Sequence, residues 1–177
     1  MYNPYMYGSQ YPYYGNTQMW NYGMMYPNYP NMVEHANHWY VEGTLKDQGP
    51  NPFVININEA TKQNNTYRTA LWTGQHLQLT LMSINPGEDI GLEIHPNVDQ
   101  FLRIEQGQGV AQMGKSRDNL SFTRYVADDS AIFIPAGTWH NVTNTGNIPL
   151  KLYSIYAPPN HPFGTVHPTK ADAAAKE

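Results

Sequence analysis

Short apolar runs separated by turn residues recur along the chain from about residue 34 to residue 160. The clearest run is 77–82, where leucines alternate with polar residues, and a period of two is typical of a half-buried strand. Similar runs bounded by Gly, Pro, Asn or Asp predict strands at 53–57, 69–72, 100–106, 109–113, 122–126, 131–134, 141–144 and 150–157. Only 59–65 and 170–176 look weakly helical. This pattern predicts an all-β sandwich or barrel.

The first 33 residues differ in composition from the rest of the chain. They contain no charged residue but hold 9 of the 14 Tyr and 6 of the 8 Met, interleaved with Asn, Pro and Gly. Because Pro and Gly recur every few residues, neither a helical nor a strand period is sustained. We therefore predict a low-complexity, disordered extension at 1–33, a folded domain at 34–160 and a C-terminal tail at 161–177. Alternatively, the extension is an adhesive arm that self-associates through its Tyr residues. In this composition it resembles proteins of bacterial spore coats.

Composition and charge exclude several classes of function. Because the chain has no Cys, it has no disulfide, thiol nucleophile or Cys-ligated metal. The net charge is −4 and the ten Lys and Arg residues form no run, so no nucleic-acid partner is expected. No apolar stretch approaches the roughly 20 residues of a membrane helix, and no secretory signal is recognisable. We therefore expect no membrane partner and a cytoplasmic location, with the spore coat as the alternative.

Four polar residues in the predicted β domain indicate a metal site. Glu93 and His95 are two positions apart, so on a strand both side chains lie on one face. Gln100 opens the next predicted strand, and His140 follows a turn that contains Pro and Gly. Two imidazoles, one carboxylate and one amide are a suitable donor set for one divalent ion of Fe, Mn, Zn or Ni.

The spacing of these residues resembles that of the cupin family, whose two motifs read G-x5-H-x-H-x3,4-E-x6-G and G-x5-P-x-G-x2-H-x3-N. The positions that correspond to the first motif are Gly87, Glu93, His95, Gln100 and Gly107. Those that correspond to the second are Asp129, in place of the leading Gly, then Pro135, Gly137, His140 and Asn144. The resemblance covers about residues 72–157. It implies a double-stranded β-helix, or jelly roll, with the metal inside the barrel.

Two ligand positions depart from the family pattern. Glu93 stands where the family has its first His, and Gln100 stands where it has Glu, so the summed ligand charge stays at about −1. Asp99 is an alternative to Gln100, but only Gln100 has the six-residue spacing to Gly107. Cupins that open or tautomerise unsaturated uronates are similar in carrying Gln at this position, and sugar-phosphate isomerase cupins mix Gln, His and Glu ligands. The resemblance therefore favours carbohydrate-type chemistry.

The resemblance leaves three functions open. The first is a metal-dependent isomerase or lyase that acts on a small sugar-like or hydroxyketone substrate. The second is a non-haem Fe(II) dioxygenase, for which His95, His140 and Glu93 would supply two imidazoles and a carboxylate. The third is a non-catalytic binding or structural cupin of the spore-coat type. A homodimer is expected as well, because cupins commonly pair through edge strands.

The remaining histidines are assigned no functional role. His76 opens a predicted strand and is expected to be half exposed, whereas His35, His38, His161 and His167 lie in terminal segments and are predicted at the surface. Alternatively, the loop that holds His161 and His167 folds near a barrel mouth. No serine has the context of a nucleophile elbow, and no glycine-rich loop has the context of a phosphate site. No catalytic residue is therefore assigned, and any chemistry is expected at the metal.

Overall fold

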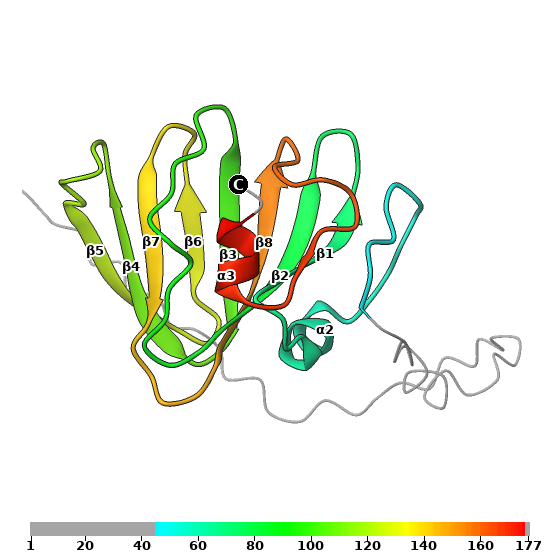
Figure 1. Cartoon of the computed structure of the whole chain (residues 1–177), viewed down its shortest axis with the longest axis horizontal. Coiled ribbons are helices and arrows are strands. Elements are labelled where there is room, and N and C mark those ends of the chain that lie inside the picture. The colour runs from blue at the N-terminus through cyan, green and yellow to red at the C-terminus, as the bar shows by residue number, and fades with distance from the viewer. Residues whose placement is uncertain (1–44, 176–177) are drawn as a thin grey trace, which may run out of the picture.

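The structure is a computed structural model that describes residues 45–175 (Figure 1). The extension at 1–33, His35 and His38 lie outside these residues. The described elements follow the order α2 (Ile57–Gln63), β1 (Arg68–Thr73), β2 (Gln78–Ile84), β3 (Asp99–Gln106), β4 (Gln108–Gly114), β5 (Phe122–Ala127), β6 (Ala131–Ile134), β7 (Trp139–Asn144), β8 (Leu150–Ala157), β9 (Val166–His167) and α3 (Lys170–Ala174). The predicted all-β class is confirmed. Neither helix in this part of the chain is long and apolar enough to span a membrane.

The strands form two antiparallel sheets that enclose one core. One sheet has six strands in the order β6-β3-β8-β2-β1-β9, and the other has three in the order β5-β4-β7. Figure 1 shows β5 and β4 at one end of the molecule and β2 and β1 toward the other. The segment between β2 and β3 extends the smaller sheet, because Asp89 bridges Thr143 and Glu93 bridges His140 on β7. This arrangement is the double-stranded β-helix that the motifs implied.

Along the larger sheet, the inward side chains change from polar to apolar. On β2, Gln78 and Thr80 are followed by Met82 and Ile84, and all four are buried. Strand β8 runs antiparallel to β2 in a register that places Tyr156 opposite Gln78. The polar ends of neighbouring strands therefore coincide, and the barrel has one polar end and one apolar end.

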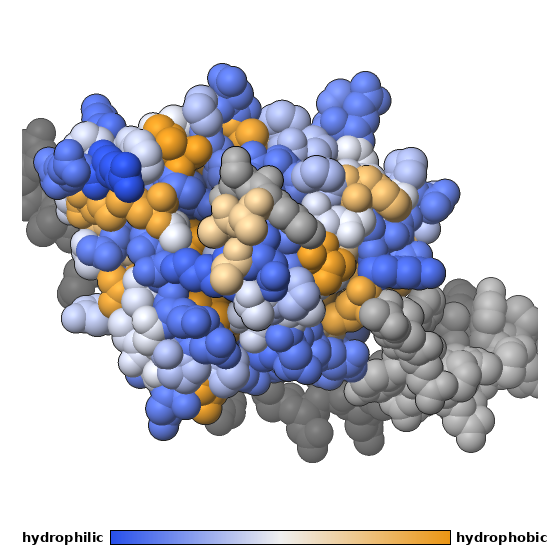
Figure 2. All heavy atoms as spheres, in the orientation of Figure 1, coloured by the Kyte–Doolittle hydropathy of each residue, from blue (hydrophilic) through white to orange (hydrophobic). Residues whose placement is uncertain are grey.

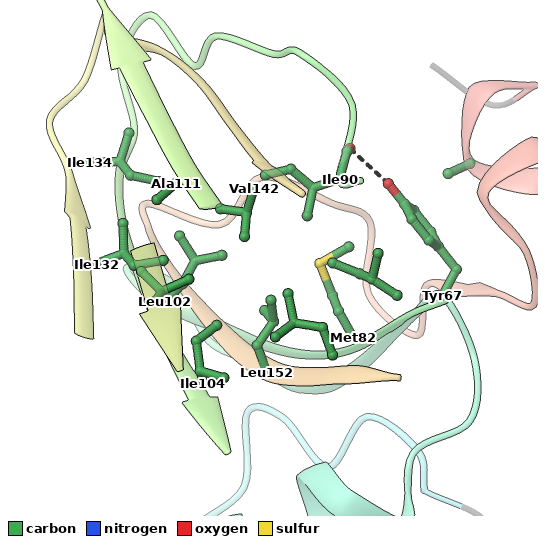
Figure 3. Packing of buried hydrophobic residues seen from close by; sticks show 14 residues of the cluster. Tyr67, Met82, Ile90, Leu102, Ile104, Ala111, Ile132, Ile134, Val142 and Leu152 are labelled. Atoms are coloured by element: carbon green, nitrogen blue, oxygen red, sulfur yellow. Dashed lines mark hydrogen bonds between the residues drawn. The ribbon is translucent and has the colours of Figure 1, made fainter. Parts of the chain in front are cut away.

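The apolar end holds the main core. Figure 3 shows buried side chains from both sheets, among them Leu102, Leu152 and Val142, pointing toward one another. At the rim of this cluster, the Tyr67 hydroxyl donates a hydrogen bond to the Ile90 carbonyl oxygen at 2.7 Å. Figure 2 shows that polar residues cover most of the face in view, with apolar residues in separate patches. Apolar burial at this end stabilises the barrel and leaves its polar end for a site.

The apolar run at 53–57 does not form the strand that the sequence predicts. Helix α2 begins at Ile57, because the Asn56 side chain caps its first turn by accepting a hydrogen bond from the Glu59 backbone nitrogen at 3.2 Å. Phe53 packs instead with Leu81 in a second apolar cluster, on the outward side of β2. The cap thus decides the local structure, and the apolar residues cover the sheet rather than joining it.

The segment that the sequence predicts as a C-terminal tail contributes two elements to the fold. Strand β9 pairs with β1 and places His167 opposite Arg68, and helix α3 places Ala173 in the main core. Thr169 and Asp172 form a capping box at the start of α3. A strand of two residues is too short to show a period, so the pattern could not reveal it.

Two motif positions have structural roles. Asp129, which replaces the leading Gly of the second motif, has a φ of 66°, a left-handed conformation that Asp tolerates better than most residues. Asn144 is buried, and its Nδ2 atom donates to the carbonyl oxygens of Ile84 and Ile148 at 2.9 and 2.8 Å. Its Oδ1 atom accepts a hydrogen bond from the Gly146 nitrogen at 2.9 Å. Asn144 therefore ties the turn before β8 to the end of β2.

Candidate metal centre

Glu93, His95 and His140 lie together at the polar end of the barrel. The Oε1 atom of Glu93 is 3.3 Å from the Nε2 atom of His95 and 3.3 Å from that of His140. One ligand atom from each of the three residues lies within 4.8 Å of the other two. The backbone sets this proximity, because Glu93 and His140 exchange two hydrogen bonds of 3.1 and 2.9 Å between their main chains. The fold thus brings together three of the four residues predicted as ligands.

The ring of His140 is fully buried and is oriented by the backbone. Its Nδ1 atom lies 2.9 Å from the Thr138 carbonyl oxygen, and this contact is a hydrogen bond when Nδ1 carries the proton. In the neutral ring, the Nε2 lone pair then faces the Glu93 carboxylate, and no described residue satisfies Nε2 with a hydrogen bond. A lone pair and a carboxylate repel each other, so the arrangement requires either a shared proton or a cation.

Gln100 is the second residue of β3 and is also buried, with its amide held in one orientation. Its Nε2 atom donates to the Ser154 hydroxyl at 2.9 Å, and its Oε1 atom is buried without a hydrogen-bond partner among the described residues. Such an oxygen is suited to a metal ion or to a ligand hydroxyl. Asp99, the alternative ligand, is exposed, and its Oδ1 atom accepts a hydrogen bond from the Ala136 nitrogen at 2.8 Å. Of the two, Gln100 is therefore the residue inside the barrel.

Glu93 is ionised in this environment. Burial by itself would raise the pKa of its carboxyl group, but the imidazoles of His140 and His95 beside it and the positive charge of Arg68 lower that pKa to about 2. A carboxylate that stays ionised beside two imidazoles is a suitable donor for a divalent cation. The three residues together offer two nitrogen donors and one carboxylate donor, a set that suits Fe, Mn, Zn or Ni.

Tyr156 and His161 extend the polar end beyond the predicted ligands. Tyr156 is fully buried, and its ring centroid lies 5.7 Å from that of His95 and 5.0 Å from that of His161. His161 is half-buried rather than at the surface, because Gln78 folds the chain back by accepting from the His161 nitrogen at 2.9 Å and donating to its carbonyl oxygen at 2.8 Å. The surface prediction for His167 is also wrong, since β9 is part of the larger sheet and the side chain is buried.

A second acidic group lies outside the polar end. Carboxylate oxygens of Glu105, Asp128 and Asp129 lie within 4.8 Å of one another. Arg103 compensates this group, because its Nε atom is 3.5 Å from the Glu105 Oε1 atom and its guanidinium forms an ion pair with Asp129. Asn58 also donates a hydrogen bond to Glu105 at 2.5 Å. The protein itself thus neutralises much of this charge, and we assign no metal to the group.

The stability of the protein is expected to fall in mild acid because of His161. Burial, and then the positive charge of Arg68, lowers the pKa of this imidazole to about 3, against 6.5 as the ordinary value. Between these two pH values, the unfolded chain binds a proton at His161 that the folded chain does not bind. The free energy of unfolding should therefore decrease as the pH falls below 6.5, by up to about 1.4 kcal/mol per pH unit.

Urea unfolding of metal-free protein from pH 6.5 to 4.5 measures this effect. His161→Gln removes the titrating group, so the free energy of unfolding of this variant should depend less steeply on pH than that of the wild type. The other titratable groups contribute equally to both proteins and cancel in the comparison. Parallel pH dependences for wild type and variant would show that His161 is not neutral in the folded protein.

Comparison with known proteins identifies the family of the chain. The sequence model of the cupin domain matches residues 80–156, a range that contains all four predicted ligands. The uncharacterized protein YrkC of Bacillus subtilis (strain 168) is 64% identical over 185 residues, covering 99% of this chain and 98% of YrkC. The uncharacterized protein L612 of Acanthamoeba polyphaga mimivirus is 47% identical over 116 residues, covering 64% of this chain and 70% of that protein. The chain belongs to the cupin superfamily.

A solved structure resembles this chain in sequence and in fold. The crystal structure of BH2720 from Bacillus halodurans has 69% sequence identity and a TM-score of 0.73, and the match covers 73% of this chain and 98% of that one. The fold of the described residues is therefore shared with an experimentally determined structure.

Proposed function

We propose that this cupin is a metal-dependent isomerase or lyase that acts on a small sugar-like or hydroxyketone substrate. The observation that carries the proposal is the group of three candidate ligands with atoms within 4.8 Å of one another, inside a barrel end that is otherwise lined by polar side chains. With Gln100 these are four donors, and octahedral ions accept roughly six, which leaves room for substrate oxygens. A divalent ion held there supplies Lewis-acid chemistry by polarising a carbonyl or hydroxyl oxygen.

Tyr156 is the residue best placed to hold a proton for this reaction. Its hydroxyl group is buried and makes no well-formed hydrogen bond to any described residue. Burial raises the pKa of this hydroxyl, so it remains protonated and acts as a donor. The ring lies against His95, which places it beside the candidate ligands. Isomerisation and elimination both move a proton next to a carbonyl group, and a donor at the substrate oxygen stabilises the charge that develops there.

A non-haem Fe(II) dioxygenase is the second candidate function. Its support is the same triad, since two imidazoles and one carboxylate on one face, with open positions, are the donor set of such enzymes. The buried hydroxyl groups of Thr80 and Tyr156 favour the first function, because they are suited to a substrate that itself carries hydroxyl and carbonyl oxygens.

Proton exchange with solvent distinguishes these functions. Full-length protein prepared without an affinity tag is analysed for its metal and incubated in D2O with a panel of hydroxyketones and aldoses, while NMR follows deuterium incorporation and an electrode follows oxygen. We expect deuterium to enter beside the carbonyl of at least one substrate, at a rate at least about 100-fold lower in Glu93→Gln. Oxygen uptake without exchange would assign the dioxygenase instead. Neither reaction in fully metal-loaded protein would contradict both and indicate a non-catalytic cupin.

A further inference from the structure

We propose that the outward face of the larger sheet carries a docking groove for the extension at 1–33 of the same chain. The groove lies outside the barrel, on the other side of the sheet from the main core and the polar end. The inference is therefore independent of the metal-dependent function proposed above, and neither depends on the outcome of the other.

A row of apolar side chains crosses five strands on this outward face. The register of the sheet aligns one residue from each strand, in the order Phe133, Phe101, Ile155, Leu79 and Trp72. The three central residues each lie between two buried residues that point into the barrel, and side chains alternate along a strand. The row therefore faces outward, and with strands about 4.8 Å apart it is about 19 Å long.

The row lies in a groove formed by two adjoining hollows. The larger, of about 720 Å³, is lined by the segment before α2 and by residues of β1, β2 and β8. The smaller, of about 380 Å³, is lined by residues of β3, β6 and β8, and Ile155 lines both. Val54 in the larger hollow is 75% exposed, and Phe133 in the smaller is 71% exposed. Large apolar side chains gathered in one exposed groove are typical of a binding surface.

The chain passes from the extension directly onto this face. Leu45, the first described residue, packs in the second apolar cluster, to which Leu79 of the row also belongs. The segment that follows is fixed to β1, because the Trp72 Nε1 atom donates to the Asn51 carbonyl oxygen at 2.8 Å. Residues 34–44 span at most about 36 Å when fully extended, so the extension reaches any point of the row. Such a tether gives the extension an effective concentration in the millimolar range.

The composition of the extension suits this groove. None of the described residues that line the larger hollow is charged, and the extension has no charge either, so docking buries no ion. The extension contains Tyr-Pro pairs at 11–12, 26–27 and 29–30. Proline and the residue before it favour extended backbone, and Pro-rich segments bind aromatic-lined grooves in several recognition modules. About six extended residues match the length of the row.

Charge disfavours a second copy of the folded domain as the occupant. Every charged residue of the chain lies after residue 33, so the net charge of −4 belongs entirely to the rest of the chain. Two such domains approaching each other bring together like charges, whereas the extension adds none. The tethered extension is therefore the occupant that the observations favour.

Limited proteolysis of the full-length protein with chymotrypsin, which cleaves after Tyr and Phe, measures this docking. A docked site is cleaved only from the undocked population, so the cleavage rate within 1–33 reports the docking equilibrium. Val54→Asp and Phe133→Asp each introduce a charge that docking would bury. We expect each variant to raise this rate at least about 5-fold, as followed by mass spectrometry.

Phe163→Asp is the matched control. Phe163 is 62% exposed on the loop at 160–167 and lines neither of the two hollows, so the same added charge should leave the rate unaltered. Circular dichroism checks that each variant is folded, and the two groove variants substitute for each other if one is not. Equal cleavage rates in the wild type and the folded groove variants overturn the inference.

Photo-cross-linking identifies the occupant directly. Because the chain has no Cys, Leu77→Cys provides a single thiol in the larger hollow, to which a benzophenone maleimide is attached. We expect cross-links to residues 1–33 at the mass of one chain, and none from the same label at Phe163→Cys. Cross-links at the mass of two chains, or a cleavage rate that falls as protein concentration rises, would show docking between copies and overturn the same-chain assignment.

Discussion

Replacement of His140 by alanine is expected to lower the affinity for divalent metal at least about 100-fold. The wild-type chain should bind about one Co(II), Mn(II) or Zn(II) ion, because we propose Glu93, His95, Gln100 and His140 as the donors of a single site. Loss of His140 removes the nitrogen that faces the Glu93 Oε1 atom at 3.3 Å, and water cannot restore the oriented lone pair. Metal content by mass spectrometry and affinity by calorimetry measure the effect.

The control for this prediction is His76→Ala. His76 is exposed in the turn between β1 and β2, so its loss should leave both metal content and affinity unchanged. Because His140 is fully buried, its variant is checked for folding by circular dichroism, and Glu93→Gln provides a variant of nearly equal volume. Wild-type metal binding by folded His140→Ala would contradict the assignment of the site.

Replacement of Asn144 by alanine is expected to destabilise the barrel by about 2–5 kcal/mol. The side chain satisfies the carbonyl oxygens of Ile84 and Ile148 and the nitrogen of Gly146, and alanine can make none of these three hydrogen bonds. Each backbone group left unsatisfied in a buried position costs about 1–3 kcal/mol, and local relaxation recovers part of this cost. The melting temperature should fall by about 10 °C, as measured on metal-free protein by circular dichroism.

Asn147→Ala is the matched control, because Asn147 lies in the same turn but is exposed. Its effect on the free energy of unfolding should stay within about 0.5 kcal/mol. Metal content of the folded Asn144 variant should remain normal, since this motif residue supports the fold and is not a metal donor. Equal stability of the two variants would contradict the structural role of Asn144.

The centre of the candidate site was accessible from the sequence. Glu93 and His95 are expected on one face because side chains alternate along a strand. His140 is identified by its position in the second motif. The same alternation of side chains places Tyr156 on the inner face. In the strand at 150–157, the leucines at 150 and 152 point inward, and Tyr156 is an even number of positions from both. This signal does not distinguish a site residue from a core residue, because a Tyr in an apolar strand is also typical of an ordinary core.

The sequence by itself determined the all-β class, because alternation and turn residues are local properties, and its two motifs implied the double-stranded β-helix by resemblance. Only the tertiary structure decided what surrounds the ligands. Gln78 folds His161 back across a separation of 83 residues, and Arg68 reaches the barrel interior because β1 joins the larger sheet beside β2. A pattern along the chain reports on which face of a strand a residue lies. It does not report which distant segment covers that face.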